Sequence, residues 1–337
     1  MSVLKKFGIN WLDQSYHWSN FNKLKKDRKY IDFLYEKTLK SFAENLNDYF
    51  KVNGNLRYWR IIIGPWLIFY ITSMFDRWEV IRLLTRKKKK IYLKTKGIND
   101  SIFYNYNLLN YYDKACEDDL WNEKNYLRIL NFKREKNYVL KKNYSKIIDY
   151  NKTSTKKINL YILIDKFLSF FGIILNKNLI ESFYFSKKNL IKIFFKSKIF
   201  PAWYISTFKD SVEDSKKFFN IKDRKIFFSN FPKYKKSFEK YLFDCFVTDF
   251  PIVYFERFNK KQNEIKWITK FKKKNIFTMI SHTFNEKFKF YVASMILKGT
   301  KLNIVQHGGG NNSLDYYFES NLEHYKKIGD TFLVWSK

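Results

Sequence analysis

The segment IFTMISHTFNEKFKFYVASMILKGTKLNIVQ, residues 276–306, decides the fold of this chain. Its two ends, residues 276–281 and 301–306, have the length and residue types of short strands. Between them, apolar residues recur three or four positions apart, which is the spacing of a buried helix face, and Gly299 suits a helix C-terminus. A strand, a helix and a second strand in this order predict a parallel βαβ unit and hence an α/β fold.

Other segments extend this α/β region over residues 156–337. Residues 225–230 and 331–336 are predicted as further short strands, and the strongly apolar residues 158–175 as a helix. The preceding residues, 1–155, are predicted to form a large helical region. We expect both regions to belong to one lobe.

The helical region contains two helix patterns. Residues 32–50 carry Leu and Phe at steps of three to five positions, which fits one buried face. Residues 55–84 predict one long helix, or two helices separated near Gly64 and Pro65, because proline removes a backbone donor. The apolar run 61–75 inside this segment is shorter than the roughly 20 residues that a membrane-spanning helix needs. It is therefore predicted as a buried helix, with an interfacial segment as the alternative.

The composition narrows the possible functions. Hydrophobic residues make up 45% of the 337 residues, which is enough for a packed core. The 65 Lys and Arg against 32 Asp and Glu leave a net charge of +33. Such a charge attracts polyanions: nucleic acid, anionic lipids or phosphorylated substrates. The two cysteines, Cys116 and Cys245, exclude a disulfide scaffold and indicate a reducing compartment, so we expect a cytoplasmic protein.

The sequence QHGGG directly follows the second strand of the βαβ unit. It comprises Gln306, His307, Gly308, Gly309 and Gly310. Ligands of α/β proteins bind beyond the carboxyl ends of parallel strands, and consecutive glycines let backbone N–H groups approach an anion closely. A histidine there can act as a general base or acid near neutral pH. We interpret QHGGG as a ligand-binding loop; the alternative is a turn that needs positive φ.

A second polar segment, SHTFNE, ends the first strand of the unit and offers His282 and Glu286. Because adjacent parallel strands end at the same edge, we expect this segment near His307, where Glu286 could orient a histidine or accept a sugar hydroxyl. A helix-capping role is the alternative. Arg57 and Arg60, three positions apart, can clamp a phosphate or carboxylate, or else form salt bridges on a helix surface.

The remaining candidates are polar residues at the two ends of the chain. His17 lies between aromatic residues, which is typical of a packed histidine, and Glu319 belongs to a polar stretch with helical spacing. A zinc site made of His282, His307 and His324 is conceivable, but their spacing does not support it. We therefore expect no bound metal.

Several phrases together resemble one known family, the LIC12162-type transferases. That family is associated with O-antigen and other bacterial surface polysaccharides, and is similar to two-lobed glycosyltransferases of the GT-B type. The phrases occur in the family's order: YHWSN (16–20), RYWRIIIGPWL with FDRW (57–78), FPIVYFERF (250–258), KGTKLNIVQHGGGNN (298–312) and GDTFLVWS (329–336).

The resemblance implies a Rossmann-like N-terminal lobe and a transferase that uses a nucleotide-sugar donor, a glycan or lipid-linked acceptor, and no cofactor or metal. It implies His307 as base or phosphate contact, the backbone of Gly308 to Gly310 as an anion cradle, and Glu286 as a supporting group. The sequence GGGNN departs from the family pattern in this loop. A second lobe would follow the last strand in that family, so the chain is expected to be a fragment, and both activity and inactivity of the chain alone stay open.

Two other functions stay open at this stage. The charge of +33 and the 21% aromatic residues fit a nucleic-acid-binding protein, although no RNP, zinc-finger or helix-turn-helix phrase is present. A non-catalytic remnant of a transferase is the third possibility. For the enzyme, the positive charge favours peripheral contact with the anionic inner face of the membrane.

Overall fold

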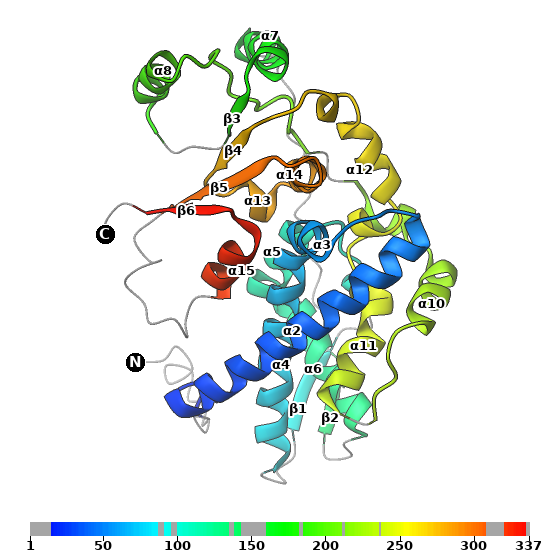
Figure 1. The fold of residues 1–337 in the computed structure, drawn as a ribbon. Coiled ribbons are helices and arrows are strands. Elements are labelled where there is room, and N and C mark those ends of the chain that lie inside the picture. Colours follow the sequence, from blue (N-terminus) through cyan, green and yellow to red (C-terminus); the bar gives the residue numbers. More distant parts are fainter. Residues whose placement is uncertain are drawn as a thin grey trace.

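The computed structural model describes residues 15–86, 91–95, 100–134, 138–142, 160–181, 185–210, 213–235, 237–307 and 320–334. Figure 1 shows a helical part, which surrounds helices α2 (Phe21–Phe50) and α4 (Gly64–Arg86), and a small parallel sheet beside it. Helix α15 (Ser320–Ile328) lies between the two parts. The described chain is mostly helical with a parallel sheet, and this arrangement confirms the α/β class.

The sheet has four parallel strands in the order β3-β4-β5-β6. Strand β4 pairs with β5 in the register Asn275↔Lys301, and helix α14 (Glu286–Ile296) connects them, so the predicted βαβ unit is confirmed. Gly299 has a φ of 83° just after α14, the left-handed conformation for which glycine is favoured. The strands span β3 (Asn178–Glu181), β4 (Asn275–Thr278), β5 (Lys301–Val305) and β6 (Thr331–Leu333); a separate parallel pair is β1 (Ile91–Thr95) and β2 (Tyr138–Lys142).

The strand predicted at residues 225–230 is wrong, because this segment belongs to helix α10 (Ile221–Ser229). Asn220 caps the helix by accepting hydrogen bonds from the backbone N–H groups of Lys222 and Asp223. Arg224, Phe227 and Phe228 are buried at helical spacing, so the short apolar run is one face of a helix. The edge strand β3, by contrast, was not predicted.

The N-terminal helices form the main core. Helix α2 (Phe21–Phe50) begins earlier than predicted, with Asn20 as its cap. Of the two alternatives predicted for residues 55–84, the structure shows two helices: α3 (Leu56–Ile62) and α4 (Gly64–Arg86) are separate, and Pro65 stands in the first turn of α4, where no N–H donor is needed. Trp66 of α4 is fully buried and packs against Phe42 and Phe250.

Helices from the second predicted region also join this core. Tyr70 of α4 donates a 2.7 Å hydrogen bond to Asp249 at the end of α11, so residues 238–249 pack on the N-terminal helices. The predicted boundary at residue 155/156 lies outside the described residues. The remaining helices are α5 (Leu108–Glu117), α6 (Asp119–Lys133), α7 (Leu160–Leu175), α8 (Lys187–Lys196), α9 (Ser215–Phe218), α11 (Phe238–Asp249), α12 (Phe258–Ile265), α13 (Ser281–Phe284), α14 (Glu286–Ile296) and α15 (Ser320–Ile328), with short 3-10 turns at η1 (Asp100–Phe103), η2 (Ile252–Tyr254) and η3 (Ile268–Lys270).

Among the helices that the structure describes, none combines the length and the apolar character required to cross a membrane.

Candidate functional site

The carboxyl edge of the parallel sheet gathers several predicted site residues. Strands β4 and β5 are neighbours, so His282, which follows β4, and His307, which follows β5, stand beyond adjacent strand ends. Gln306 is buried, and its backbone N–H donates a 2.8 Å hydrogen bond to the Leu333 carbonyl of β6. This bond holds the backbone that carries His307 against the sheet.

His282 is a fully buried, neutral imidazole. Its ring meets Tyr325 of α15 edge to face, with ring centroids 4.7 Å apart. Within the described residues, neither ring nitrogen has a hydrogen-bond partner. Burial, helped by the nearby His307 and Lys289, lowers the pKa of His282 to about 3. A buried polar group without a partner is costly, and this is a feature of sites that meet a ligand or a water molecule.

His307 is more accessible. Its side chain is half-buried, and its Nε2 atom has no hydrogen-bond partner in the described part of the chain. Burial lowers the pKa of His307 below its usual value, so the ring is neutral at pH 7 and can accept a proton. The position and the protonation state therefore suit a general base.

His324 of α15 is a third histidine, close to His282. It is buried, and the Tyr35 hydroxyl of α2 lies 3.3 Å from its Nδ1 atom. Burial first, and then the nearby His282 and Arg60, lower the pKa of His324 well below its usual value. Gly64 makes room for this contact, because a Cβ atom there would stand 2.8 Å from Cε1 of His324. The three histidines thus belong to one neighbourhood.

Glu181, the last residue of β3, was not foreseen from the sequence. It is buried and accepts hydrogen bonds from the hydroxyls of Ser281 (2.9 Å) and Thr278 (3.4 Å) across the strand pair. Burial raises its pKa to about 7, despite the two hydroxyl donors. The only sequence signal was an acidic residue at the end of the short apolar run NLIE.

A cavity of about 390 Å³ opens beside Glu181 and Ser281. Its lining combines carboxylates, hydroxyls, one lysine and aromatic rings, a mixture suited to a polar ligand that carries a ring. The lining residues are Tyr161, Ile162, Asp165, Glu181, Tyr204, Ile205, Ser206, Phe208, Lys209, Asp210, Ser281 and Asn285.

The structure places Glu286 inside the protein, at the start of α14. Its carboxylate forms a fully buried ion pair with Lys289 at 2.8 Å. It also accepts a 2.9 Å hydrogen bond from the Tyr254 hydroxyl and a 3.4 Å hydrogen bond from the Leu108 backbone. Burial, the strongest influence, raises its pKa. These contacts tie the sheet to the helical core, and Glu286 is not part of the cavity lining.

Both arginines of α3 bind protein carboxylates. Arg57 forms a salt bridge with Asp330 at 2.6 Å and donates to the Ile328 carbonyl, which fastens α15 and β6 to α3. Arg60 forms a two-pronged pair with Glu36 of α2, each contact 2.7 Å long. In this conformation, the two guanidinium groups serve as connections between elements around the histidines.

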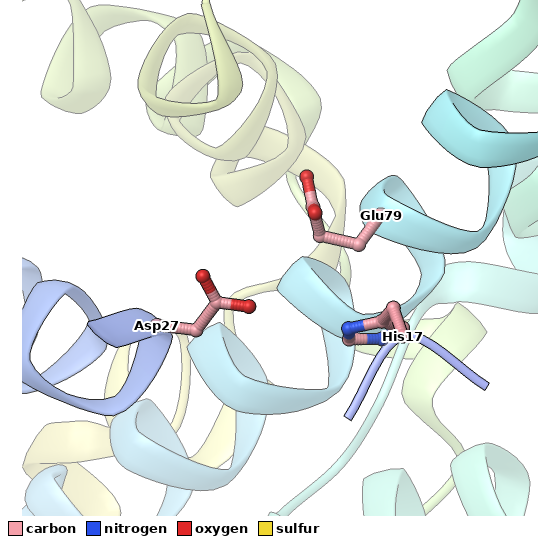
Figure 2. Close-up of side chains that lie close together, drawn as sticks. All are labelled: His17, Asp27 and Glu79. Atoms are coloured by element: carbon pink, nitrogen blue, oxygen red, sulfur yellow. The ribbon is translucent and has the colours of Figure 1, made fainter. Parts of the chain in front are cut away.

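His17 lies in a different cluster, far along α4 from the sheet edge. Its Nε2 atom is 2.9 Å from Asp76, twelve residues after Gly64, a separation of about 18 Å along a helix. Figure 2 shows His17, Asp27 of α2 and Glu79 of α4 around a common point. Their ligand atoms lie within 4.8 Å of one another, close enough to hold a metal ion; among the described residues no other set of three does so.

Protein cations already neutralise that cluster. The Lys23 ammonium contacts both Asp27 and, at 2.8 Å, Glu79, while Arg82 contacts Glu79 at 2.6 Å. Burial alone would raise the pKa of Glu79, but these two cations lower it to about 2. We interpret the cluster as an ion-pair network that joins α2 to α4. The predicted residues Gly308, Gly309, Gly310 and Glu319 lie outside the described residues.

The comparisons with known proteins add one finding. A family model described as LIC12162 family transferase matches residues 10–336. Searches of the curated proteins and of the solved structures returned no match.

Proposed function

The chain belongs to the LIC12162 family of transferases, and from this membership we propose that it is a GT-B-type glycosyltransferase of bacterial surface-polysaccharide synthesis, O-antigen included. In this proposal, its sheet is part of a Rossmann-like lobe. The donor is a nucleotide-sugar and the acceptor is a glycan or a lipid-linked sugar. Donor and acceptor meet at the carboxyl edge of the sheet, where α/β proteins bind their ligands.

The observation that carries the proposal is His307 at the end of β5. Its ring is neutral because burial lowers its pKa, and its Nε2 has no hydrogen-bond partner among the described residues. As the acceptor hydroxyl attacks the anomeric carbon, its proton passes to His307. A new carbon–oxygen bond forms, and the bond from the anomeric carbon to the donor phosphate breaks with its electron pair staying on the phosphate.

The negative charge on the departing phosphate needs a counterpart. The three glycines after His307 in the sequence would supply backbone N–H groups, and Lys209 supplies an exposed ammonium at the cavity. Glu181 and Ser281 would hold sugar hydroxyls at the cavity wall. No step of this mechanism requires a metal ion or another cofactor, and we place the reaction on the cytoplasmic side of the membrane.

The proposal is tested by screening nucleotide-sugars against the full chain. Binding of uridine, guanosine, cytidine and thymidine diphosphate or monophosphate sugars is measured by the rise in melting temperature, and sugar release or transfer is measured for each binder. We expect one class to bind and turn over, and His307→Ala to retain binding but to lose turnover about 100-fold or more. Lys222→Ala, an exposed change on α10, is the control. Failure of every nucleotide-sugar to bind contradicts the proposal.

The charge of +33 favours a second candidate, the binding of nucleic acid. A salt series with single-stranded DNA and RNA separates the two functions. Binding that survives about 0.5 M salt supports specific nucleic-acid recognition, because purely electrostatic attraction falls steeply with salt. Loss of all nucleic-acid binding at moderate salt would show that the binding at low salt is nonspecific electrostatic attraction, and would leave the transferase as the proposed function.

A further inference from the structure

Helix α7 has the reverse of the amphipathic pattern of an ordinary surface helix. Its inward side consists of small or polar residues, Asp165, Ser169 and Gly172, together with Ile173. Its outward side carries large apolar side chains, with Leu160 at 70% exposure and Phe167 at 63%. We call this outward side the α7 face; it comprises Leu160, Leu163, Ile164, Phe167, Phe170, Ile174 and Leu175.

Specific contacts fix this orientation. The Asp165 carboxylate accepts a 2.7 Å hydrogen bond from the Ser206 backbone, and the Ser169 hydroxyl accepts a 3.0 Å hydrogen bond from the Tyr204 backbone. A Cβ atom on Gly172 would stand 2.5 Å from the Cβ of Ala202, so only glycine allows this close approach. Two hydrogen bonds and one close packing contact thus hold the inward side of α7 against residues 202–206. Rotation of α7 about its axis would break them.

The apolar surface continues beyond α7. Trp267 stacks on Phe170 with ring centroids 6.1 Å apart and is itself exposed. Contiguous apolar patches of this kind are rare on proteins that act free in solution, and they mark interaction sites. Figure 1 shows α7 at one end of the molecule, away from the helical core around α2 and α11. The α7 face is therefore accessible to a large partner.

Positive charge borders the α7 face at its C-terminal end. Lys273 donates a 2.6 Å hydrogen bond to the Asn176 carbonyl just after α7, and the Lys274 backbone donates to the Lys177 carbonyl, also at 2.6 Å. The basic run KFKKK, residues 270–274, is thereby held beside the helix. The exposed lysines of this border are Lys177, Lys266, Lys270, Lys272 and Lys274.

The acidic residue of α7, Asp165, is on the buried side, so it does not offset this charge. Apolar and aromatic side chains next to a row of lysines form the pattern of a segment that lies in a membrane interface. Anionic head groups meet the lysines, while the apolar side chains enter the region below. A second copy of the chain is a poorer partner, because it would bring the same lysines and the same net charge of +33.

We propose that the α7 face docks the protein on an anionic lipid membrane. Helix α7 lies in the plane of the surface, with Phe167 and its apolar neighbours inserted and the exposed border lysines on the head groups. Tyr161, Ile162 and Asp165 on the other side of α7 line the cavity beside Glu181, whereas Phe167 and the border lysines do not, so the residues proposed for docking are distinct from the cavity lining.

Co-sedimentation with vesicles tests the proposal on the full chain. The vesicles are phosphatidylglycerol with phosphatidylcholine, one to one, and pure phosphatidylcholine, at low and high salt. The test variant is Leu163→Ser with Phe167→Ser and Phe170→Ser. A matched control changes exposed apolar residues elsewhere: Phe33→Ser, Leu109→Ser and Ile226→Ser.

We expect the unaltered chain and the control to bind anionic vesicles, and the test variant to bind about tenfold more weakly or worse. Exchanging Lys270, Lys272 and Lys274 for Gln should weaken binding to anionic vesicles more than the same exchange at Lys222, Lys225 and Lys233. Near-ultraviolet circular dichroism confirms that each variant is folded.

Two results overturn the proposal. Equal vesicle binding by the test and control triple variants would leave only nonspecific attraction by the net charge. Self-association that is lost in the test variant, without vesicle binding by the unaltered chain, would assign the α7 face to a second copy. Neither result bears on the nucleotide-sugar screen, so failure of the membrane proposal can be distinguished from failure of the proposed transferase function.

Discussion

The Ser281 hydroxyl donates a 2.9 Å hydrogen bond to the carboxyl group of Glu181, joining the carboxyl ends of β3 and β4 beside the cavity. Burial raises the pKa of Glu181 to about 7 from an ordinary value of 4.5. The folded chain therefore keeps this proton up to about pH 7, whereas the unfolded chain releases it near pH 4.5. Stability from this group is present below pH 4.5 and is lost as the pH rises toward 7.

We predict that Glu181→Gln removes this loss. Relative to the variant, the unaltered chain should lose about 3 kcal/mol of unfolding free energy between pH 4.5 and 7. Urea denaturation at several pH values measures the difference. Glu44→Gln, at an exposed position of α2, is the control and should leave the pH dependence unchanged. Parallel pH curves for the unaltered chain and Glu181→Gln would show that Glu181 ionises normally in the fold.

The buried histidine His282 gives a pH dependence of opposite sign. Its pKa in the fold is about 3, so it stays neutral there while the unfolded chain takes up a proton below about pH 6.5. The stability is present above pH 6.5 and falls as the pH drops. We predict that His282 contributes about 2 kcal/mol to the stability lost between pH 6.5 and 5, and that His282→Gln removes this contribution while that of His324 remains. Thermal melts across this range would contradict the prediction if the variant lost stability as steeply as the unaltered chain.

His307 should control the pH dependence of catalysis. Burial lowers its pKa, so the neutral ring that accepts a proton persists to a lower pH than a free imidazole allows. We predict that kcat/KM falls toward acidic pH with a midpoint below the ordinary histidine value of about 6.5. The rate remaining in His307→Ala should lack this acidic limb. A limb that persists in the variant would assign the base to another group.

The parts of the fold and of the candidate site that could be predicted from the sequence are those with a pattern in neighbouring residues. The βαβ unit was predicted because its apolar spacing and Gly299 are local signals, and the parallel pairing then placed His282 and His307 at neighbouring strand ends. The segment NLIE of β3 has only two apolar residues, fewer than the segments 276–281, 301–306 and 331–336 that were predicted as strands, so Glu181 was missed with it. Residues 225–230 were misread because a short apolar run fits a strand as well as a helix face.

Tertiary contacts had no sequence signal. Tyr35 and His324 meet although 289 positions separate them, and Asp330, the carboxylate partner of Arg57, lies 273 positions further along the chain. Periodicity identified α7 as a helix, but it could not say which side faces inward. That choice follows from the bonds of Asp165 and Ser169 to residues 204 and 206.

The first residue of α4 sets how closely α15 approaches the helical core. A Cβ atom on Gly64 would stand 2.7 Å from the Tyr35 hydroxyl and 2.8 Å from Cε1 of His324. We predict that Gly64→Ala costs about 1–3 kcal/mol of unfolding free energy, because two packed rings would have to shift. Tyr35→Phe removes the hydroxyl oxygen nearest to the added methyl group, so Gly64→Ala should cost less in that background. Chemical denaturation of the four chains measures both effects, and an equal cost in the two backgrounds would show that the Tyr35 hydroxyl does not limit the space at Gly64.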